Sequence, residues 1–170
     1  MSVDVFAADE QQEIPVDVMR WVRLARMVLE EEQVPGGAEL SLIFVDERAI
    51  ADLNERFLGG AGPTDVLAFP MDDDIVPAGR QPDQGGRGPG SPSEPGEPPA
   101  MIGDVVVCPS YARREAESRR RALDEELALL VVHGVLHLLS YDHAEEQESE
   151  AMQRRERELL ERFRRLEQEG

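Results

Sequence analysis

The three histidines of the chain, His133, His137 and His143, fall within one short stretch. Residues four apart on an α-helix differ by about 40° in azimuth, so His133 and His137 project from one face. A predicted helix break near Ser140 and Tyr141 would let the chain turn back and bring His143 to the same point. Neutral imidazole suits Zn²⁺, and three protein ligands leave a fourth position for water, as in catalytic zinc sites. We therefore expect one Zn²⁺ per chain, bound by these three histidines.

The alternative is that His133 and His137 are core histidines whose ring nitrogens bond to neighbouring protein groups. Both lie in residues 127–139 (LALLVVHGVLHLL), the most apolar helical segment of the sequence. Two buried imidazoles on one helix face would be costly unless each found a polar partner. A bound metal supplies that partner to both, so the pattern favours a metal site.

The spacing H-x3-H-x5-H also matches the metzincin zinc proteases, in which a glutamate follows the first histidine and acts as general base. Gly134 stands at that position here. Glycine has no group that transfers protons, which argues against peptide hydrolysis by the metzincin route. A glycine inside a helix costs roughly 1 kcal/mol relative to alanine, so Gly134 indicates either a close approach of backbone or substrate, or tight packing.

Carboxylates elsewhere in the sequence are candidates for proton transfer. Asp142, beside His143, could orient an imidazole or act as a general base, and a turn-forming Asp is the plainer alternative. Asp65 and Asp104 lie in predicted strands, and the sequence leaves their roles open. We therefore name Asp142 alone as a candidate catalytic side chain. Cys108 is expected to be a buried strand residue rather than a fourth ligand.

The segments around the histidines alternate between strand and helix patterns, which predicts a single α+β domain over residues 1–170. Residues 127–139 are apolar nearly all round, which predicts a central, zincin-like helix buried on every side. Asp124 is its expected N-cap, and Asp46 is the expected N-cap of an earlier helix. We expect a small mixed sheet of about four strands with about five helices. The strands are predicted at 2–6, 39–45, 65–69 and 102–108, and the helices at about 15–34, 46–57, 109–121, 124–139 and 145–167.

One segment departs from this alternation. Residues 77–100 contain 13 Pro or Gly among 24 residues and no aliphatic side chain larger than alanine. Such a stretch cannot bury enough apolar surface to offset the entropy lost on ordering. We therefore expect a disordered loop inserted into the domain, since the sequences on either side each look incomplete alone.

The charge of the chain sets a condition on any nucleic-acid partner. With 36 acidic and 18 basic side chains, the formal net charge is −18, which should repel nucleic acid unless the cations are gathered in one place. Residues 111–121 carry five Arg against two Glu. If helical, they form a cationic ridge that could contact phosphates, with Arg113, Arg114 and Arg120 as candidates. The alternative is a solvated helix face compensated by neighbouring carboxylates.

A second set of arginines is interleaved with Glu in the last predicted helix, which favours ordinary i, i+4 ion pairs there. These residues are Arg154, Arg155, Arg157, Arg162, Arg164 and Arg165.

Several observations predict a cytoplasmic protein with no membrane partner. No apolar run reaches the roughly 20 residues that a membrane span needs. The N-terminal residues lack a basic-then-apolar signal pattern, and the single cysteine fits a reducing compartment.

Two further blocks accompany the histidine stretch, residues 133–143 (HGVLHLLSYDH). They are residues 63–70 (PTDVLAFP) and 102–108 (IGDVVVC). In this order the three blocks resemble the YbeY family of bacterial endoribonucleases, and the resemblance covers nearly the whole chain except residues 77–100. It implies a zinc-dependent hydrolase of single-stranded RNA that acts in 3′-end maturation of 16S ribosomal RNA and in removal of defective ribosomes. Carried over by position, the zinc ligands are His133, His137 and His143.

Two positions depart from the family pattern. Ser140 stands where the signature usually has Gly, which costs roughly 1 kcal/mol if the position needs a positive φ. Leu58 stands where many members carry an Arg after the aromatic residue. Arg56, two positions earlier, would face a different side of a helix. The phosphate contact of that family Arg is therefore in question here.

The sequence thus predicts a single-strand-specific, zinc-dependent endoribonuclease of 16S ribosomal RNA maturation and ribosome quality control. Its expected partners are single-stranded ribosomal RNA and the small ribosomal subunit or assembly factors, with no DNA. The alternative is a non-catalytic, metal-stabilised ribosome-assembly factor, which Leu58 and the net charge of −18 favour. A metallohydrolase of another substrate, peptides included, is a third alternative, and Gly134 argues against it.

Overall fold

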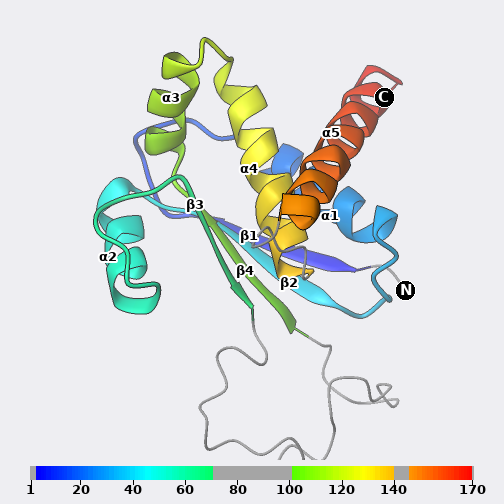
Figure 1. Ribbon diagram of the computed structural model, residues 1–170, viewed down its shortest axis with the longest axis horizontal. Helices are drawn as coiled ribbons and strands as arrows, with labels where there is room; N and C mark the ends of the chain where they lie inside the picture. The colour runs from blue at the N-terminus through cyan, green and yellow to red at the C-terminus, as the bar shows by residue number, and fades with distance from the viewer. Residues whose placement is uncertain (1–2, 71–100, 140–145, 170) are drawn as a thin grey trace, which may run out of the picture.

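The protein folds as a four-stranded sheet with helices on both faces (Figure 1). The structure, a computed structural model, describes residues 3–70, 101–139 and 146–169. Within these residues it contains four strands and five helices in an α+β arrangement, as predicted. The predicted loop at 77–100 lies outside the described residues. In chain order the elements are β1 (Asp4–Asp9), α1 (Val18–Glu31), β2 (Glu39–Phe44), α2 (Glu47–Phe57), β3 (Val66–Pro70), β4 (Met101–Val107), α3 (Pro109–Ser118), α4 (Leu123–Leu138) and α5 (Glu146–Glu169).

The sheet has the strand order β1-β2-β4-β3. β1 pairs with β2, and β2 with β4, in parallel, whereas β3 runs antiparallel to β4 at one edge, so the sheet is mixed as predicted. The register between β2 and β4 shifts where Leu40 meets Gly103. Gly103 has a φ of 150°, and a Cβ there would lie 2.4 Å from the carbonyl oxygen of Phe69. Glycine is therefore required for this approach of β4 to β3.

Alternation along the strands divides the core between the two faces of the sheet. Leu40, Leu42 and Phe44 of β2 are fully buried in the larger cluster, together with side chains of α1 and α4. Val106 of β4 belongs to the smaller cluster, which includes Ile50 of α2. Because successive strand side chains point to opposite faces, α4 and α2 lie on opposite sides of the sheet (Figure 1). The helix that carries His133 and His137 therefore rests on the larger core.

Two helix starts test the predicted caps. Oδ1 of Asp46 accepts a hydrogen bond from the backbone N–H of Ala49 at 2.8 Å, so Asp46 caps α2 as predicted. The predicted cap at Asp124 is wrong, because the extended residue before α4 is Ala122. Asp124 lies in the first turn, where its negative charge favours the helix N-terminus. Glu125 accepts a hydrogen bond from the backbone N–H of Ala122 at 3.2 Å and so completes this start.

Three element boundaries differ from the predictions for local reasons. β1 continues to Asp9 because its backbone stays in register with β2. The helix predicted from residue 15 begins only after Asp17, whose side chain accepts a hydrogen bond from the N–H of Arg20 at 3.3 Å. α3 ends at Ser118, since Arg120 has a left-handed φ of 55°. None of the helices in the described part of the chain is long and apolar enough to span a membrane.

Candidate active site

The central helix α4 lies directly on β4 because one position on it has no side chain. Gly134 is buried, and a Cβ there would lie 2.6 Å from Cγ1 of Val105, well inside the optimal separation of two carbon atoms. Tight packing therefore accounts for Gly134. α4 is largely buried, as predicted, but not on every side, because one stripe stays partly or fully accessible. The stripe consists of Glu125, Leu129, His133 and His137, at intervals of four residues.

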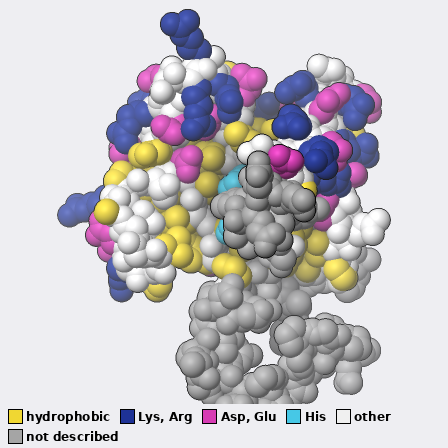
Figure 2. Space-filling model, viewed as in Figure 1, with side chains coloured by type: hydrophobic (Ala, Val, Ile, Leu, Met, Phe, Trp, Pro, Cys, Tyr) yellow, Lys and Arg dark blue, Asp and Glu magenta, His cyan; other side chains and the backbone are white. Residues whose placement is uncertain are grey.

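His133 and His137 project from this accessible stripe, as their spacing predicts. Their ring centroids are 6.2 Å apart, and the ring planes are inclined by 16°. The side chain of His133 is 34% exposed, and His137 is exposed. Figure 2 shows the histidines at the surface beside hydrophobic side chains. Two imidazoles that leave one helix face a turn apart can bind one cation between them.

A buried carboxylate holds the first histidine in place. Oε2 of Glu156, on α5, lies 2.6 Å from Nδ1 of His133, and Glu156 is only 7% exposed. With the carboxylate ionised, Nδ1 carries the proton and donates this hydrogen bond, so Nε2 keeps its lone pair. A carboxylate in this position orients a metal-binding histidine and raises its basicity. The donor chemistry therefore fits a zinc ion at Nε2 of His133.

Sequence reasoning missed Glu156, although the last helix contains a signal for it. An acidic residue that interrupts a buried apolar stripe requires a polar partner in the core, and a histidine on the neighbouring helix is such a partner. The buried stripe of α5 consists of Met152, Glu156, Leu159 and Phe163, at helical spacing.

The third predicted ligand lies beyond the described part of α4. The helix ends at Leu138, with Leu139 as its C-cap, close to the predicted break. His143, the catalytic candidate Asp142 and the family departure Ser140 all lie outside the described residues. Among the residues that the structure describes, no group of three potential metal ligands comes together. The structure thus brings together two of the three histidines that were predicted as ligands.

Other candidate groups have structural partners away from α4. Asp104 lies next to Val105 on β4 and so points to the opposite face of the sheet from α4. Burial raises the pKa of Asp104, and a hydrogen bond with Ser41 opposes that rise. Cys108 is fully buried on the α2 side, and burial raises the pKa of its thiol to about 11. The carbonyl of Asp65, just before β3, accepts a hydrogen bond from the N–H of Cys108 at 2.9 Å.

The cationic ridge predicted on α3 is partly compensated by carboxylates. Arg114 pairs with Glu47 of α2 at 2.9 Å. Arg119 and Arg121 both pair with Glu126 of α4, at 3.2 and 3.1 Å, and Glu126 is only 1% exposed. These ion pairs fix the connection between α3 and α4, and they engage three of the five guanidinium groups.

The remaining candidate arginines, and the position of the family Arg, have different surroundings. Arg113 and Arg120 are exposed, and neither forms an ion pair with another described residue. At the departure from the family pattern, Leu58 is the exposed C-cap of α2. Arg56 pairs with Asp52 on the same helix at 3.3 Å, so its charge is already engaged.

The arginines of α5 find partners on or just after α1 more than along their own helix. Arg155 pairs with Glu32 at 2.6 Å, and Arg162 pairs with Glu31 at 2.9 Å. Within the described part of α5, Arg155 also pairs with Glu158, three residues away. The predicted i, i+4 pairing is therefore wrong, because packing of α5 beside α1 decides which charges meet. Four arginines of α5 form no ion pair with a described residue: Arg154, Arg157, Arg164 and Arg165.

The fold and the site together place this protein in a class of α+β proteins whose largely buried central helix presents a pair of histidines. Such a pair is the metal-ligand pattern of metal-dependent hydrolases. A family model described as "Endoribonuclease YbeY" matches residues 6–164. This chain belongs to the YbeY family.

Named relatives and a solved structure agree with this membership. "Endoribonuclease YbeY" of Thermobifida fusca (strain YX) is 45% identical over 170 residues, which cover 99% of either chain. "Endoribonuclease YbeY" of Mycobacterium sp. (strain KMS) is 45% identical over 163 residues, which cover 96% of this chain and 84% of the relative. The solution structure of TM1509 from Thermotoga maritima has a TM-score of 0.56 at 22% identity, covering 98% of this chain and 95% of that chain. This last similarity concerns the fold alone.

Proposed function

We propose that this protein is a zinc-dependent endoribonuclease that cleaves single-stranded RNA. Membership of an endoribonuclease family supports RNA cleavage, and the arrangement of His133, His137 and Glu156 supports the zinc dependence. We further propose that it acts in the cytoplasm in 3′-end maturation of 16S ribosomal RNA and in ribosome quality control. Its substrate would be single-stranded ribosomal RNA, and its partners the small ribosomal subunit or assembly factors.

The residues proposed to hold one Zn²⁺ are His133, His137 and His143, with a fourth position for water. When bound, zinc supplies polarisation of a phosphoryl oxygen and a lower pKa of water, towards about 7. Glu156 keeps the proton on Nδ1 of His133, so that Nε2 keeps the lone pair that would bind the metal. Gly134 packs against the sheet and transfers no proton, so the base for the attacking water must be another group.

Asp142 is the proposed candidate for that proton transfer, because it is adjacent to His143 in the sequence. Replacing Asp142 by Asn should lower the turnover number without removing zinc, since the amide keeps the size of the side chain but accepts no proton. Turnover and zinc content are to be measured on the same preparation. Full activity of D142N would exclude Asp142 as the base.

Three arginines on or just after α3 are proposed to contact phosphates of the RNA. Arg113 and Arg120 have no ion pair with a described residue, so their guanidinium groups can bind phosphate oxygens bidentately. Arg114 would exchange Glu47 for a phosphate. These contacts would position the strand without reading its sequence.

A non-catalytic ribosome-assembly factor is the second candidate function, favoured by the exposed Leu58 and the net charge of −18. The deciding experiment incubates single-stranded and duplex RNA of one sequence with tag-free, zinc-loaded protein at low salt, beside His137→Ala. We expect zinc-dependent cleavage of the single strand that H137A abolishes. No cleavage by folded, fully metallated protein would favour the assembly factor.

A further inference from the structure

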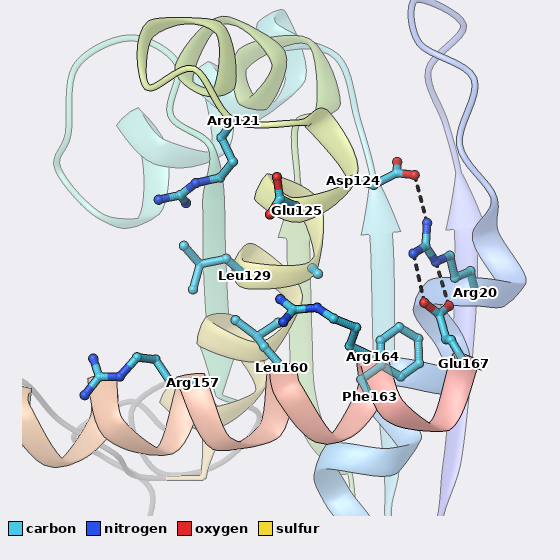
Figure 3. A pocket seen from close by; sticks show the side chains of 11 residues that line it. Arg20, Arg121, Asp124, Glu125, Leu129, Arg157, Leu160, Phe163, Arg164 and Glu167 are labelled. Carbon is cyan, nitrogen blue, oxygen red and sulfur yellow. Dashed lines mark hydrogen bonds and ion pairs between the residues drawn. The ribbon is translucent and has the colours of Figure 1, made fainter. Parts of the chain in front are cut away.

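The accessible stripe of α4 continues past the histidines into a groove between α4 and α5, called here the α4–α5 groove. Its volume is about 400 Å³, and its lining includes Leu129 of α4 and Leu160 of α5. Arg121, Arg157 and Arg164 line it as well, and Figure 3 shows their side chains around these two leucines. The groove therefore combines apolar surface with several guanidinium groups, and it meets the end of the cationic ridge at Arg121.

The positive charge of the α4–α5 groove is only partly compensated. Arg20 pairs with Asp124 and with Glu167, at 2.8 Å each, so two of the carboxylates in the lining are already engaged (Figure 3). Arg157 and Arg164 form no ion pair with a described residue. The third carboxylate of the lining, Glu125, accepts a hydrogen bond from the backbone N–H of Ala122. The guanidinium groups of Arg157 and Arg164 are thus left for an external anion, on a chain whose net charge is −18.

The α4–α5 groove lies next to the histidine site along both helices. Leu129 precedes His133 by one turn on the same face of α4, about 6 Å along the helix axis. On α5, Arg157 follows Glu156, whose carboxylate contacts His133. Arg164 lies seven residues further, about 10 Å along α5. A strand with one phosphate at the histidines could therefore extend along the groove over Arg157 and Arg164.

We propose that the α4–α5 groove binds the backbone of the single-stranded RNA substrate next to the cleaved bond, with Arg157 and Arg164 contacting its phosphates. The inference rests on the proposed function and names a substrate-binding site for it. Planar guanidinium groups match phosphate oxygens bidentately, and such contacts fix the position of a strand. The position of the groove beside the histidines favours a substrate strand over a protein segment, which need not reach the site of cleavage.

The test compares R157Q/R164Q with R154Q/R165Q, two variants with the same change of charge on the same helix. Arg154 and Arg165 are exposed and do not line the groove, so they are the matched control. Binding of a fluorescently labelled single-stranded RNA to full-length, zinc-loaded protein is followed by anisotropy at several salt concentrations. R157Q/R164Q should weaken binding roughly tenfold at low salt and reduce the slope of log K against log salt by about 1.4, or about 0.7 per phosphate contact. R154Q/R165Q should leave that slope unchanged.

Different failures of this test have different meanings. Equal losses in the two double variants, with cleavage retained, would overturn the groove as an RNA site but leave the proposed function intact. Wild-type protein that neither binds nor cleaves single-stranded RNA would overturn both. If R157Q/R164Q keeps its RNA affinity but no longer associates with small ribosomal subunits, the groove binds a protein and the RNA assignment is wrong. Should the double variant unfold, R157Q and R164Q singly should each reduce the slope by about 0.7.

Discussion

At the scale of single residues, the Glu156 carboxylate determines which nitrogen of His133 faces outward. Glu156→Gln keeps the size of the side chain but removes the charged acceptor that orients the imidazole. We expect zinc affinity to fall about 10- to 100-fold, measured by competition with a chromogenic chelator. Glu158→Gln, which removes the pair of Glu158 with Arg155, is the control and should bind zinc normally. Wild-type zinc affinity in E156Q would contradict the orienting role.

Gly134 sets the distance between α4 and the sheet. Gly134→Ala would place a methyl group 2.6 Å from Cγ1 of Val105, and a β-branched side chain in a central strand has little freedom to move. We expect a loss of about 1–3 kcal/mol in the free energy of unfolding, measured in urea, despite the better helix propensity of alanine. Val105→Ala should relieve the clash, so the losses in G134A/V105A should be less than additive. Additive losses would show that this contact does not govern the spacing.

Single residues were predictable from the sequence where local geometry alone decides their position. His133 and His137 share a face because the helix repeat puts them there, whatever else the chain does. Glu156 lies 23 residues from His133, so its role depends on how α5 packs against α4. The sequence does not distinguish Asp104 from the other candidate carboxylates. In the structure its neighbour Val105 faces α4, so Asp104 lies on the opposite face of the sheet.

At the scale of elements, the turn from α3 into α4 depends on one buried carboxylate. R119A/R121A would leave Glu126, 1% exposed, without either of its ion-pair partners. Because both guanidinium groups are partly exposed, we expect a moderate loss of about 1–3 kcal/mol in unfolding free energy. Adding Glu126→Gln to this variant should restore part of the loss, because it removes the buried charge. Urea midpoints of the double and triple variants test this, and equal midpoints would contradict it.

The order of helices and strands followed from hydrophobic periodicity, because each element shows its own buried face in its own residues. The strand order β1-β2-β4-β3 could not be predicted in this way, since the residues of a strand do not determine which strand it pairs with. Ion pairs of α5 were assigned to the wrong helix for the same reason. Arg155 and Arg162 meet carboxylates at the end of α1 that are more than 120 residues away in the sequence.

At the scale of the whole molecule, the distribution of charge matters more than its sum. The net charge is −18, yet Figure 2 shows arginine side chains gathered over α3 and over α5, on the face that presents the histidines. Acidic side chains lie among these arginines, so the face can attract a polyanion only at guanidinium groups that form no ion pair with a described carboxylate. This distribution could not be predicted from the sequence, because it depends on which arginines are paired.

The segment between β3 and β4 can be tested as a unit. Pro70 and Gly103 are partners in the antiparallel pair, so the chain leaves the sheet and returns to it at neighbouring positions. Replacing residues 73–98 by a four-residue Gly/Ser linker should raise the free energy of unfolding by about 1 kcal/mol, because a shorter loop loses less entropy on closure. Urea unfolding measures the change, and zinc content reports the histidine site. Loss of folding would show that the segment contributes to the core.

The chain leaves the sheet after Pro70 and re-enters it at a neighbouring position in β4, and this also affects how the protein can evolve. Insertions and deletions between Pro70 and Met101 keep the two ends of the segment at neighbouring positions of the sheet, so they need not alter the pairing of β3 with β4. Selection for this pairing therefore acts on the residues of the two strands. The length of the segment can therefore change during evolution without a compensating change in the pairing of β3 with β4.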